Sequence, residues 1–187
     1  MPPIVTTALL ALVCLLLLAA MRWGWRHHAG RSAALVPELP AVPAPGDPLL
    51  GAARTAPIEA TYVSSTTAGD WLERVVAFDL GVRSSAVVQV HDGGVLVART
   101  GARDLFIPAA AVRGVRTAPG MAGKFVGGDG LVVLTWQAPG SGTPQLDTGL
   151  RLRHRSDKTV LTEAVEALAP ATQTSADQSG ATRKENT

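Results

Sequence analysis

The chain has 187 residues and a formal net charge of +2, so it is long enough for one domain of ordinary size. Its single cysteine, Cys14, excludes a disulfide framework within one chain. Between residues 58 and 169, eleven basic residues balance eleven acidic ones. This balance argues against a nucleic-acid-binding surface, which needs a concentrated basic footprint.

The first segment is strongly apolar. Residues 4–21 carry no charge and include seven leucines, and their only polar side chains are Thr6 and Thr7. As a helix, these residues at about 1.5 Å each span roughly 27 Å, close to the hydrocarbon thickness of a membrane. We therefore expect residues 1–30 to form a single-pass transmembrane anchor and its flank. The alternative is a cleaved signal peptide, which requires a basic stretch before the apolar segment, and none is present.

The residues that follow this segment predict its orientation. Arg22, Trp23, Trp25 and Arg26 suit the membrane interface, where indole rings and arginine side chains are favoured. No basic residue precedes the segment, so we expect the positive flank on the cytoplasmic side. This predicts a plasma-membrane protein with its N-terminus outside and its folded domain in the cytoplasm.

A proline-rich stretch comes next. Residues 31–57 include six prolines, a density that favours extended polyproline II structure. At about 3.1 Å per residue this stretch reaches at most ~80 Å. We expect a linker that leaves the following domain free to turn, and a docking role for the prolines is the alternative.

The pattern then changes to short β-strands. The clearest signal is a hairpin, because β-rich runs at 86–90 and 95–99 flank His91, Asp92 and two glycines. Residues 70–78 are ambiguous between a short helix and a strand. Residues 118–130 hold five glycines and one proline and predict a long exposed loop. Further strands are expected over 58–63, 105–108, 111–117, 131–137 and 145–155.

One helix closes the domain. Val160, Leu161, Val165 and Leu168 recur at helical spacing, and Pro170 ends the pattern. About seven strands followed by one amphipathic helix predict a mostly β fold, an antiparallel barrel of the pleckstrin-homology-like (PH-like) type capped by its C-terminal helix. We expect this domain over residues 58–169 and a disordered polar tail over 170–187.

Seven short runs of this region carry a resemblance to known proteins. They are YVSSTT at 62–67, WLER at 71–74, GVLVAR at 94–99, LFIP at 105–108, VRGV at 112–115, GLVVLTW at 130–136 and LDTGLR at 146–151. The middle runs resemble bacterial PH-like domains, and the whole set resembles a family of actinobacterial single-pass membrane proteins with such a domain. That family has been loosely labelled as transport or export proteins. The resemblance implies the PH-like fold and the anchor, and it implies no ligand.

Basic residues along the last predicted strand form the main candidate site. Arg151, Arg153 and Arg155 alternate, so a strand places their side chains on one face, and Lys158 follows closely. Such a face could bind the phosphate groups of anionic lipids or a protein partner. The alternative is a solvated strand face opposite acidic residues, which the balanced charge of the domain favours.

Two tryptophans form a second candidate surface. Trp71 and Trp136 lie in patterned segments, where core packing is the first interpretation and a partner surface the second. No set of side chains has the spacing of a catalytic or metal site, so we expect no enzymatic activity, no cofactor and no metal. The sequence predicts a membrane-anchored binding or scaffolding module at the cytoplasmic face, for a protein partner. The alternatives are an anionic-lipid sensor and an accessory subunit of a transport or export system.

Overall fold

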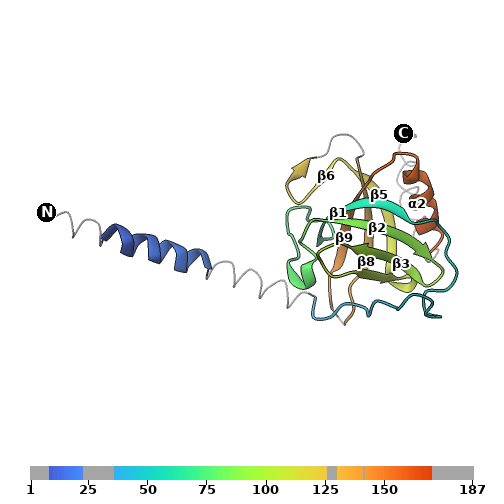
Figure 1. Ribbon diagram of the computed structural model, residues 1–187, viewed down its shortest axis with the longest axis horizontal. Helices are drawn as coiled ribbons and strands as arrows, with labels where there is room; N and C mark the ends of the chain where they lie inside the picture. Colours follow the sequence, from blue (N-terminus) through green and yellow to red (C-terminus); the bar gives the residue numbers. More distant parts are fainter. Residues whose placement is uncertain (1–8, 23–35, 126–129, 141, 170–187) are drawn as a thin grey trace, which may run out of the picture.

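The computed structural model describes residues 9–22, 36–125, 130–140 and 142–169, and it shows a mostly β domain with a C-terminal helix (Figure 1). Seven strands form one antiparallel sheet in the order β4-β3-β2-β1-β9-β8-β5, and β6 pairs separately with β7. The expected mostly β fold of about seven strands with a C-terminal helix is confirmed. The elements are β1 (Ile58–Thr67), η1 (Ala77–Asp79), β2 (Ser84–His91), β3 (Gly94–Arg99), β4 (Leu105–Pro108), η2 (Ala109–Ala111), β5 (Val112–Ala118), β6 (Gly120–Met121), β7 (Lys124–Phe125), β8 (Leu131–Gln137), β9 (Gln145–Leu152) and α2 (Asp157–Glu166).

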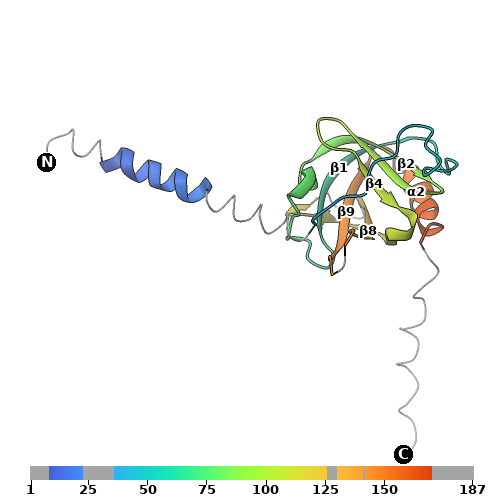
Figure 2. The same cartoon turned by 90° about the horizontal axis from the view of Figure 1, so that it is seen from below.

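The sheet curls around β1, which lies between two strands that each pair with only part of it. It pairs with β2 over Ile58–Tyr62 and with β9 over Ala60–Thr67, and the register with β9 shifts between Tyr62 and Ser64. A register shift of this kind bends a strand and increases its twist. The sheet, which we call the barrel, therefore wraps around one apolar core, and α2 packs beside β5 and β2 (Figures 1 and 2).

A chain of hydrogen bonds crosses this apolar core. Trp136 Nε1 donates to Thr148 Oγ1 at 2.9 Å, and Thr148 shares a 2.7 Å hydrogen bond with Ser65 Oγ. Ser65 in turn shares a 2.7 Å hydrogen bond with the Tyr62 hydroxyl, which also donates to the Leu80 carbonyl at 2.8 Å. Burial raises the pKa of Tyr62 to about 12. Because these buried polar groups satisfy one another, they can remain in the core without a ligand.

The C-terminal helix packs on the barrel through one stripe. Leu161 and Val165 are fully buried and Leu168 nearly so, as the helical spacing predicts. Val160 was expected in the same stripe, but half of its side chain is exposed. Successive residues of a helix point about 100° apart, so Val160 and Leu161 cannot both face the barrel squarely.

The stretch before β1 belongs to the domain, which corrects the expected free linker over 31–57. Val36 is fully buried in the main core, and Leu39 packs against that core. Leu50 and Thr55 are buried as well. The ordered domain therefore includes residues 36–57, which we call the N-terminal strap, and does not begin at residue 58. Residues 31–35 lie outside the described part of the chain.

Main-chain hydrogen bonds fix the strap to the β2–β3 hairpin. The amides of Asp92 and Gly93 donate to the carbonyls of Ala52 and Leu50, at 2.9 and 2.8 Å. A Cβ at position 93 would overlap the carbonyl oxygen of Leu49, so the hairpin glycine is what lets the strap approach. Proline density did not predict this because the bonding residues lie between the prolines and keep their own donors and acceptors.

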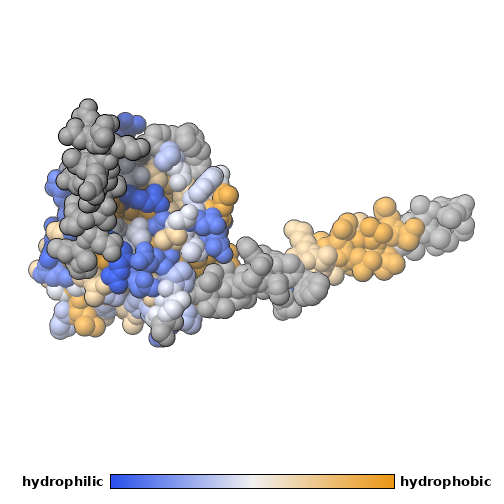
Figure 3. Space-filling view, turned by 180° about the vertical axis from the view of Figure 1, so that it is seen from behind, coloured by the Kyte–Doolittle hydropathy of each residue, from blue (hydrophilic) through white to orange (hydrophobic). Residues whose placement is uncertain are grey.

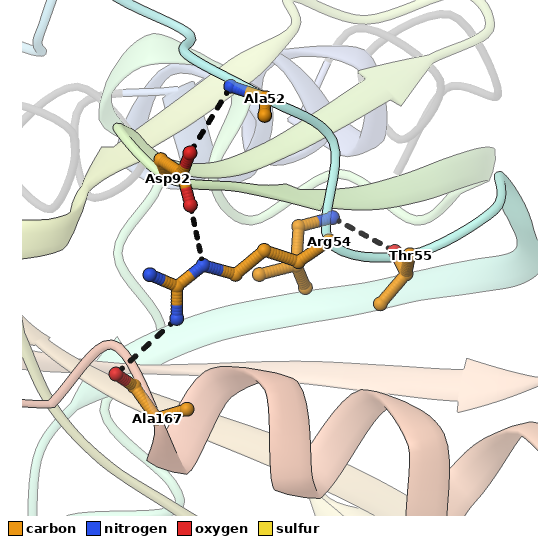
Figure 4. A network of polar contacts seen from close by, with 6 residues as sticks. Ala52, Arg54, Thr55, Asp92 and Ala167 are labelled. Carbon is orange, nitrogen blue, oxygen red and sulfur yellow. Dashed lines mark hydrogen bonds and ion pairs between the residues drawn. The ribbon is translucent and has the colours of Figure 1, made fainter.

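An arginine completes the attachment (Figure 4). Arg54 Nε donates to Asp92 Oδ1 at 2.8 Å, and the other carboxylate oxygen accepts from the Ala52 amide at 3.2 Å. Arg54 Nη1 also reaches the carbonyl of Ala167, just after α2, at 3.4 Å. The hydrogen bond from Arg54 lowers the pKa of Asp92 below its usual 3.8. This Arg54 clamp joins the strap, the hairpin and the end of α2.

The glycine-rich stretch after β5 is only partly the exposed loop that the sequence predicts. β6 and β7 form a small hairpin, and Met121 at the end of β6 is almost fully buried. It joins a second apolar cluster of Val63, Ala118, Leu131 and Val133, separate from the main core. A Cβ at Gly149 would lie 2.8 Å from Met121 Sδ, so that glycine makes room for the methionine. Residues 126–129 lie outside the described part.

Residues 9–22 form a helix whose surface is apolar, visible as the continuous orange stretch in Figure 3. Its leucines are exposed by 54–67%. Among the residues that the structure describes, no helix is long and apolar enough to cross a membrane, so the expected transmembrane helix is not found there. Arg22 ends this helix, whereas Trp23, Trp25, Arg26 and the expected tail over 170–187 lie outside the described residues.

Candidate functional site

The predicted arginine face is present in part. Arg151 lies near the end of β9 and Arg153 just after it, both are exposed, and both line one groove. Arg155 and Lys158 do not line it, because β9 ends at Leu152 and not at residue 155 as expected. Arg155 follows in a turn, and Lys158 lies in the first turn of α2. The strand alternation that would align all three arginines thus stops after the second.

The groove lies over β2, β1 and β9 and has a volume of about 560 Å³. Strand pairing arranges its lining in two rows. Thr61 of β1 pairs with Ser85 on one side and with Arg151 on the other. Glu59 pairs with Val87, and the Arg153 amide donates to the Glu59 carbonyl at 2.9 Å. One row is therefore Ser85, Thr61 and Arg151, and the other is Val87, Glu59 and Arg153.

The two arginines differ in their charge partners. Arg153 Nη1 donates to Glu59 Oε2 at 2.6 Å, an exposed ion pair that neutralises this row. Within the described part of the chain, Arg151 forms no such ion pair, and its row contributes two hydroxyl groups instead of a carboxylate. The acidic partner predicted for a solvated strand face is therefore real for Arg153 and missing for Arg151.

A third arginine, Arg99, has a structural role. Its guanidinium stacks on the Tyr62 ring at 3.8 Å from the ring centroid and donates to the carbonyls of Asp79, Val82 and Arg103. It is 7% exposed, and burial lowers its pKa. With its donors used in this way, Arg99 is not available to a ligand.

The two candidate tryptophans have opposite environments. Trp136 is fully buried, as expected, whereas Trp71 is 55% exposed and the following Leu72 is 61% exposed. The interpretation of Trp71 as a core residue is wrong, because residues 70–76 form neither a helix nor a strand but a turn with one isolated bridge, between Thr66 and Arg74. An apolar pattern predicts burial only where the residues form a helix or a strand, and this turn is neither.

The turn that carries Trp71 is nevertheless held in place. Asp70 Oδ1 accepts from the amides of Leu72 and Glu73, at 3.0 and 3.2 Å. The Trp71 carbonyl accepts from the Ala122 amide at 2.7 Å, which ties the turn to the β6–β7 hairpin. We call Trp71 and Leu72 the Trp71 tip. It presents two large apolar side chains on a fixed backbone.

Sequence reasoning missed the neutral and acidic members of the groove. Glu59 and Thr61 lie within the strand expected over 58–63, whereas Ser85 lies in β2 just before the run expected at 86–90; the outward direction of all three follows from strand alternation. Their place beside Arg151 depends on β1 pairing with both β2 and β9. Residues 61 and 151 are distant in sequence, so no local pattern contained that information.

Comparison with known proteins agrees with this architecture. A model of bacterial PH domain-like sequences matches residues 36–166, a range that includes the N-terminal strap as well as the barrel and all of α2. No protein of curated function matches the sequence significantly. The match covers well over half of the chain, and the seven-stranded sheet with its C-terminal helix fits it. The chain therefore belongs to the bacterial PH domain-like family.

Proposed function

We propose that this chain is a non-enzymatic scaffolding module that binds a protein partner through the Trp71 tip, beside the cytoplasmic face of a membrane. Membership of a PH-like family supports a binding or scaffolding role in general terms. The observation that supports binding of a protein partner is the exposure of Trp71 and Leu72 on a turn that hydrogen bonds hold in place.

A turn with a fixed backbone loses little conformational entropy when it binds a partner. A flexible loop loses conformational freedom when it docks, at about 0.5–1.5 kcal/mol for each side chain that becomes immobile. The Trp71 backbone is already fixed through its carbonyl and through the Asp70 side chain. Tryptophan is also enriched among the few residues that supply most of the binding energy of protein interfaces. A partner with an apolar pocket would therefore gain contact area at a low entropic cost.

The membrane part of the proposal rests on the N-terminal segment. Residues 4–21 are uncharged, and leucines on all sides of the helix over 9–22 are exposed. An apolar helix surface of this kind requires burial, and a lipid bilayer provides it. Residues 23–35 connect this helix to the strap, and a fully extended chain of that length reaches at most roughly 50 Å. The domain would thus stay much closer to the bilayer than the tether expected from sequence allows.

Site-specific crosslinking tests the partner. A photo-crosslinking amino acid replaces Leu72 in the full chain, and in a second protein it replaces Val160, which is apolar and 51% exposed on α2. We expect position 72 to trap a defined protein in native membranes, position 160 not to, and Trp71→Ala to abolish the trapping while leaving the melting temperature nearly unchanged. Equal trapping at both positions, or trapping that survives Trp71→Ala, would contradict the proposal.

A topology reporter tests the membrane part separately. A reporter that is active only outside the cytoplasm, fused after Thr187, is expected to be silent, and the same reporter before residue 4 is expected to be active. Activity of the C-terminal fusion would refute the proposed orientation. Recovery of the chain in the soluble fraction would refute the anchor itself.

A further inference from the structure

We infer that the groove over β2, β1 and β9 is a binding site for an oxyanion of phosphate size, held by Arg151, Thr61 and Ser85. This inference does not depend on a protein partner at the Trp71 tip. It concerns the row of the groove whose basic residue has no acidic partner among the described residues.

The register of the strands brings three kinds of donor into one line. Thr61 pairs with both Ser85 and Arg151, so the three residues occupy adjacent strands at one level of the sheet. Neighbouring strands are about 4.8 Å apart, a spacing at which side chains on one face can reach a common ligand. A guanidinium offers a planar fork of N–H groups, and each hydroxyl offers one further donor.

The charge pattern directs an anion to this row. Glu59 is bonded to Arg153 at 2.6 Å, so the neighbouring row is neutral and ends in the apolar side chain of Val87. An anion over Arg151 meets an unneutralised positive charge and two neutral donors. The Glu59 carboxylate is kept from repelling that anion by its own ion pair with Arg153, which gives the second arginine an indirect role.

The number of donors favours a phosphate over a carboxylate. A carboxylate has two oxygens, and the guanidinium fork alone can bind both of them. A phosphate monoester has three terminal oxygens, which can use the guanidinium and both hydroxyls together. A lipid with a monoester phosphate headgroup, such as phosphatidic acid, and a soluble phosphate monoester share this chemistry, and the groove is open enough to admit either one.

The test is an NMR titration of the full isotopically labelled chain in uncharged detergent micelles, with inorganic phosphate as the probe. We expect saturable shifts at the amides of Thr61, Ser85 and Arg151. Arg151→Gln should weaken binding about tenfold or more, and Arg151→Lys should give an intermediate loss because it keeps the charge without the fork. Arg155→Gln is the matched control, since it removes the same charge just outside the groove, and should change affinity less than twofold.

The Glu59→Gln variant distinguishes a phosphate-binding groove from one whose charged residues only support the fold. It removes the partner of Arg153 and leaves a second positive charge beside the site, so phosphate should bind several-fold more tightly. Equal losses in Arg151→Gln and Arg155→Gln, or a titration without saturation, would overturn the inference, because either result describes a general charge effect. Unchanged thermal melting of each variant would show that the exposed substitutions leave the fold intact.

Nanodiscs distinguish the two sources of phosphate. The same chain is placed in nanodiscs of phosphatidylcholine, with or without phosphatidic acid. If the anionic lipid shifts Thr61, Ser85 and Arg151 and Arg151→Gln removes the shift, the headgroup is the source. If only added phosphate produces these shifts, the ligand is a soluble phosphate ester. Shifts in neither arm would refute the site.

Discussion

The strap and α2 lie at opposite ends of the domain sequence, and both close the barrel, but they do so by different means. α2 is attached by side chains, with Leu161 and Val165 fully buried against the core. The strap also buries Val36 in that core, but unlike α2 it forms main-chain hydrogen bonds to the β2–β3 hairpin, such as the one in which the Leu50 carbonyl accepts from the Gly93 amide at 2.8 Å. The two segments meet where Arg54 reaches the carbonyl of Ala167.

This difference explains why only one of the two segments could be recognised. A helix that packs through side chains needs apolar residues at helical spacing, and that spacing can be read directly. A segment that packs through its main chain uses donors and acceptors that nearly every residue has. The prolines at positions 37 to 57 therefore predicted a free linker, and the main-chain hydrogen bonds of the residues between them left no signal in the sequence. The two modes of attachment also predict different responses to mutation and to pH.

The largest effect is expected in α2. Replacing the fully buried Leu161 by alanine removes apolar contacts and leaves a cavity, which should lower the free energy of unfolding by about 2–5 kcal/mol. Val160→Ala on the same helix removes a half-exposed side chain and should stay within about 0.5 kcal/mol. Denaturant unfolding of both variants measures the difference. Similar values for the two would mean that α2 does not pack by one stripe.

Alkaline pH should lower the free energy of unfolding of the barrel, because Tyr62 is buried in its core. Burial raises the folded-state pKa of Tyr62 to about 12 from an ordinary 10.0, so the neutral phenol favours the folded state. That contribution is complete below pH 10 and is lost as the pH rises from 10 towards 12, and it amounts to about 2–3 kcal/mol. Tyr62→Phe should remove most of the pH dependence in this window. A wild-type unfolding free energy that is flat from pH 9 to 12 would contradict the buried hydroxyl.

A glycine tests the main-chain attachment of the strap. Gly93→Ala places a Cβ against the Leu49 carbonyl and should displace the strap, at about 1–3 kcal/mol. Gly114→Ala is the matched control, because a Cβ there meets nothing within 4 Å, and it should be neutral or slightly stabilising. Hydrogen exchange should show lost protection at the amides of Asp92 and Gly93 only in the first variant. Full protection in Gly93→Ala would mean that the strap does not need this close approach.

Sequence patterns were sufficient to predict elements whose residues are close together in the chain, such as single strands and hairpins. The β2–β3 hairpin follows from two β-rich runs around Asp92 and Gly93, and β8 lies at the residues expected for it. Trp136 and Trp71 show the limit, because both stand in patterned segments but only Trp136 is buried. Strand β8 gives the pattern around Trp136 a periodic structure, whereas the residues around Trp71 form a turn.

The candidate site was predictable only along a single strand. The shared face of Arg151 and Arg153 follows from strand alternation, which the bond from the Arg153 amide to the Glu59 carbonyl extends one residue past β9, and the prediction fails for Arg155 because it lies in a turn. The hydroxyl groups of Thr61 and Ser85, and the Glu59 partner of Arg153, depend on which strands are neighbours. Strand order is set by the packing of the whole sheet, so it has no local signature.

The smallest effect is expected where the strap depends on a charge. The hydrogen bond from Arg54 lowers the pKa of Asp92 below 3.8, so the ionised carboxylate favours the attached strap. This contribution is complete above pH 3.8 and is lost as the pH falls through the lowered value. It should be small, because the Arg54 and Asp92 side chains are 37% and 51% exposed and water screens exposed ion pairs. The Ala52 amide, which donates to Asp92 Oδ2 at 3.2 Å, reports on it through its exchange rate after correction for intrinsic pH dependence.

Between pH 5 and 2 the protection of that amide should therefore fall, while amides of the barrel interior keep theirs. Asp92→Asn should show the low protection already at neutral pH. Asp79→Asn removes a carboxylate that lies 4.0 Å from Arg103 and away from the clamp, so it should leave Ala52 unchanged. If acid exposed the strap and α2 together, the two segments would form one cooperative unit through Arg54 and Ala167, and their different modes of attachment would not make them independent.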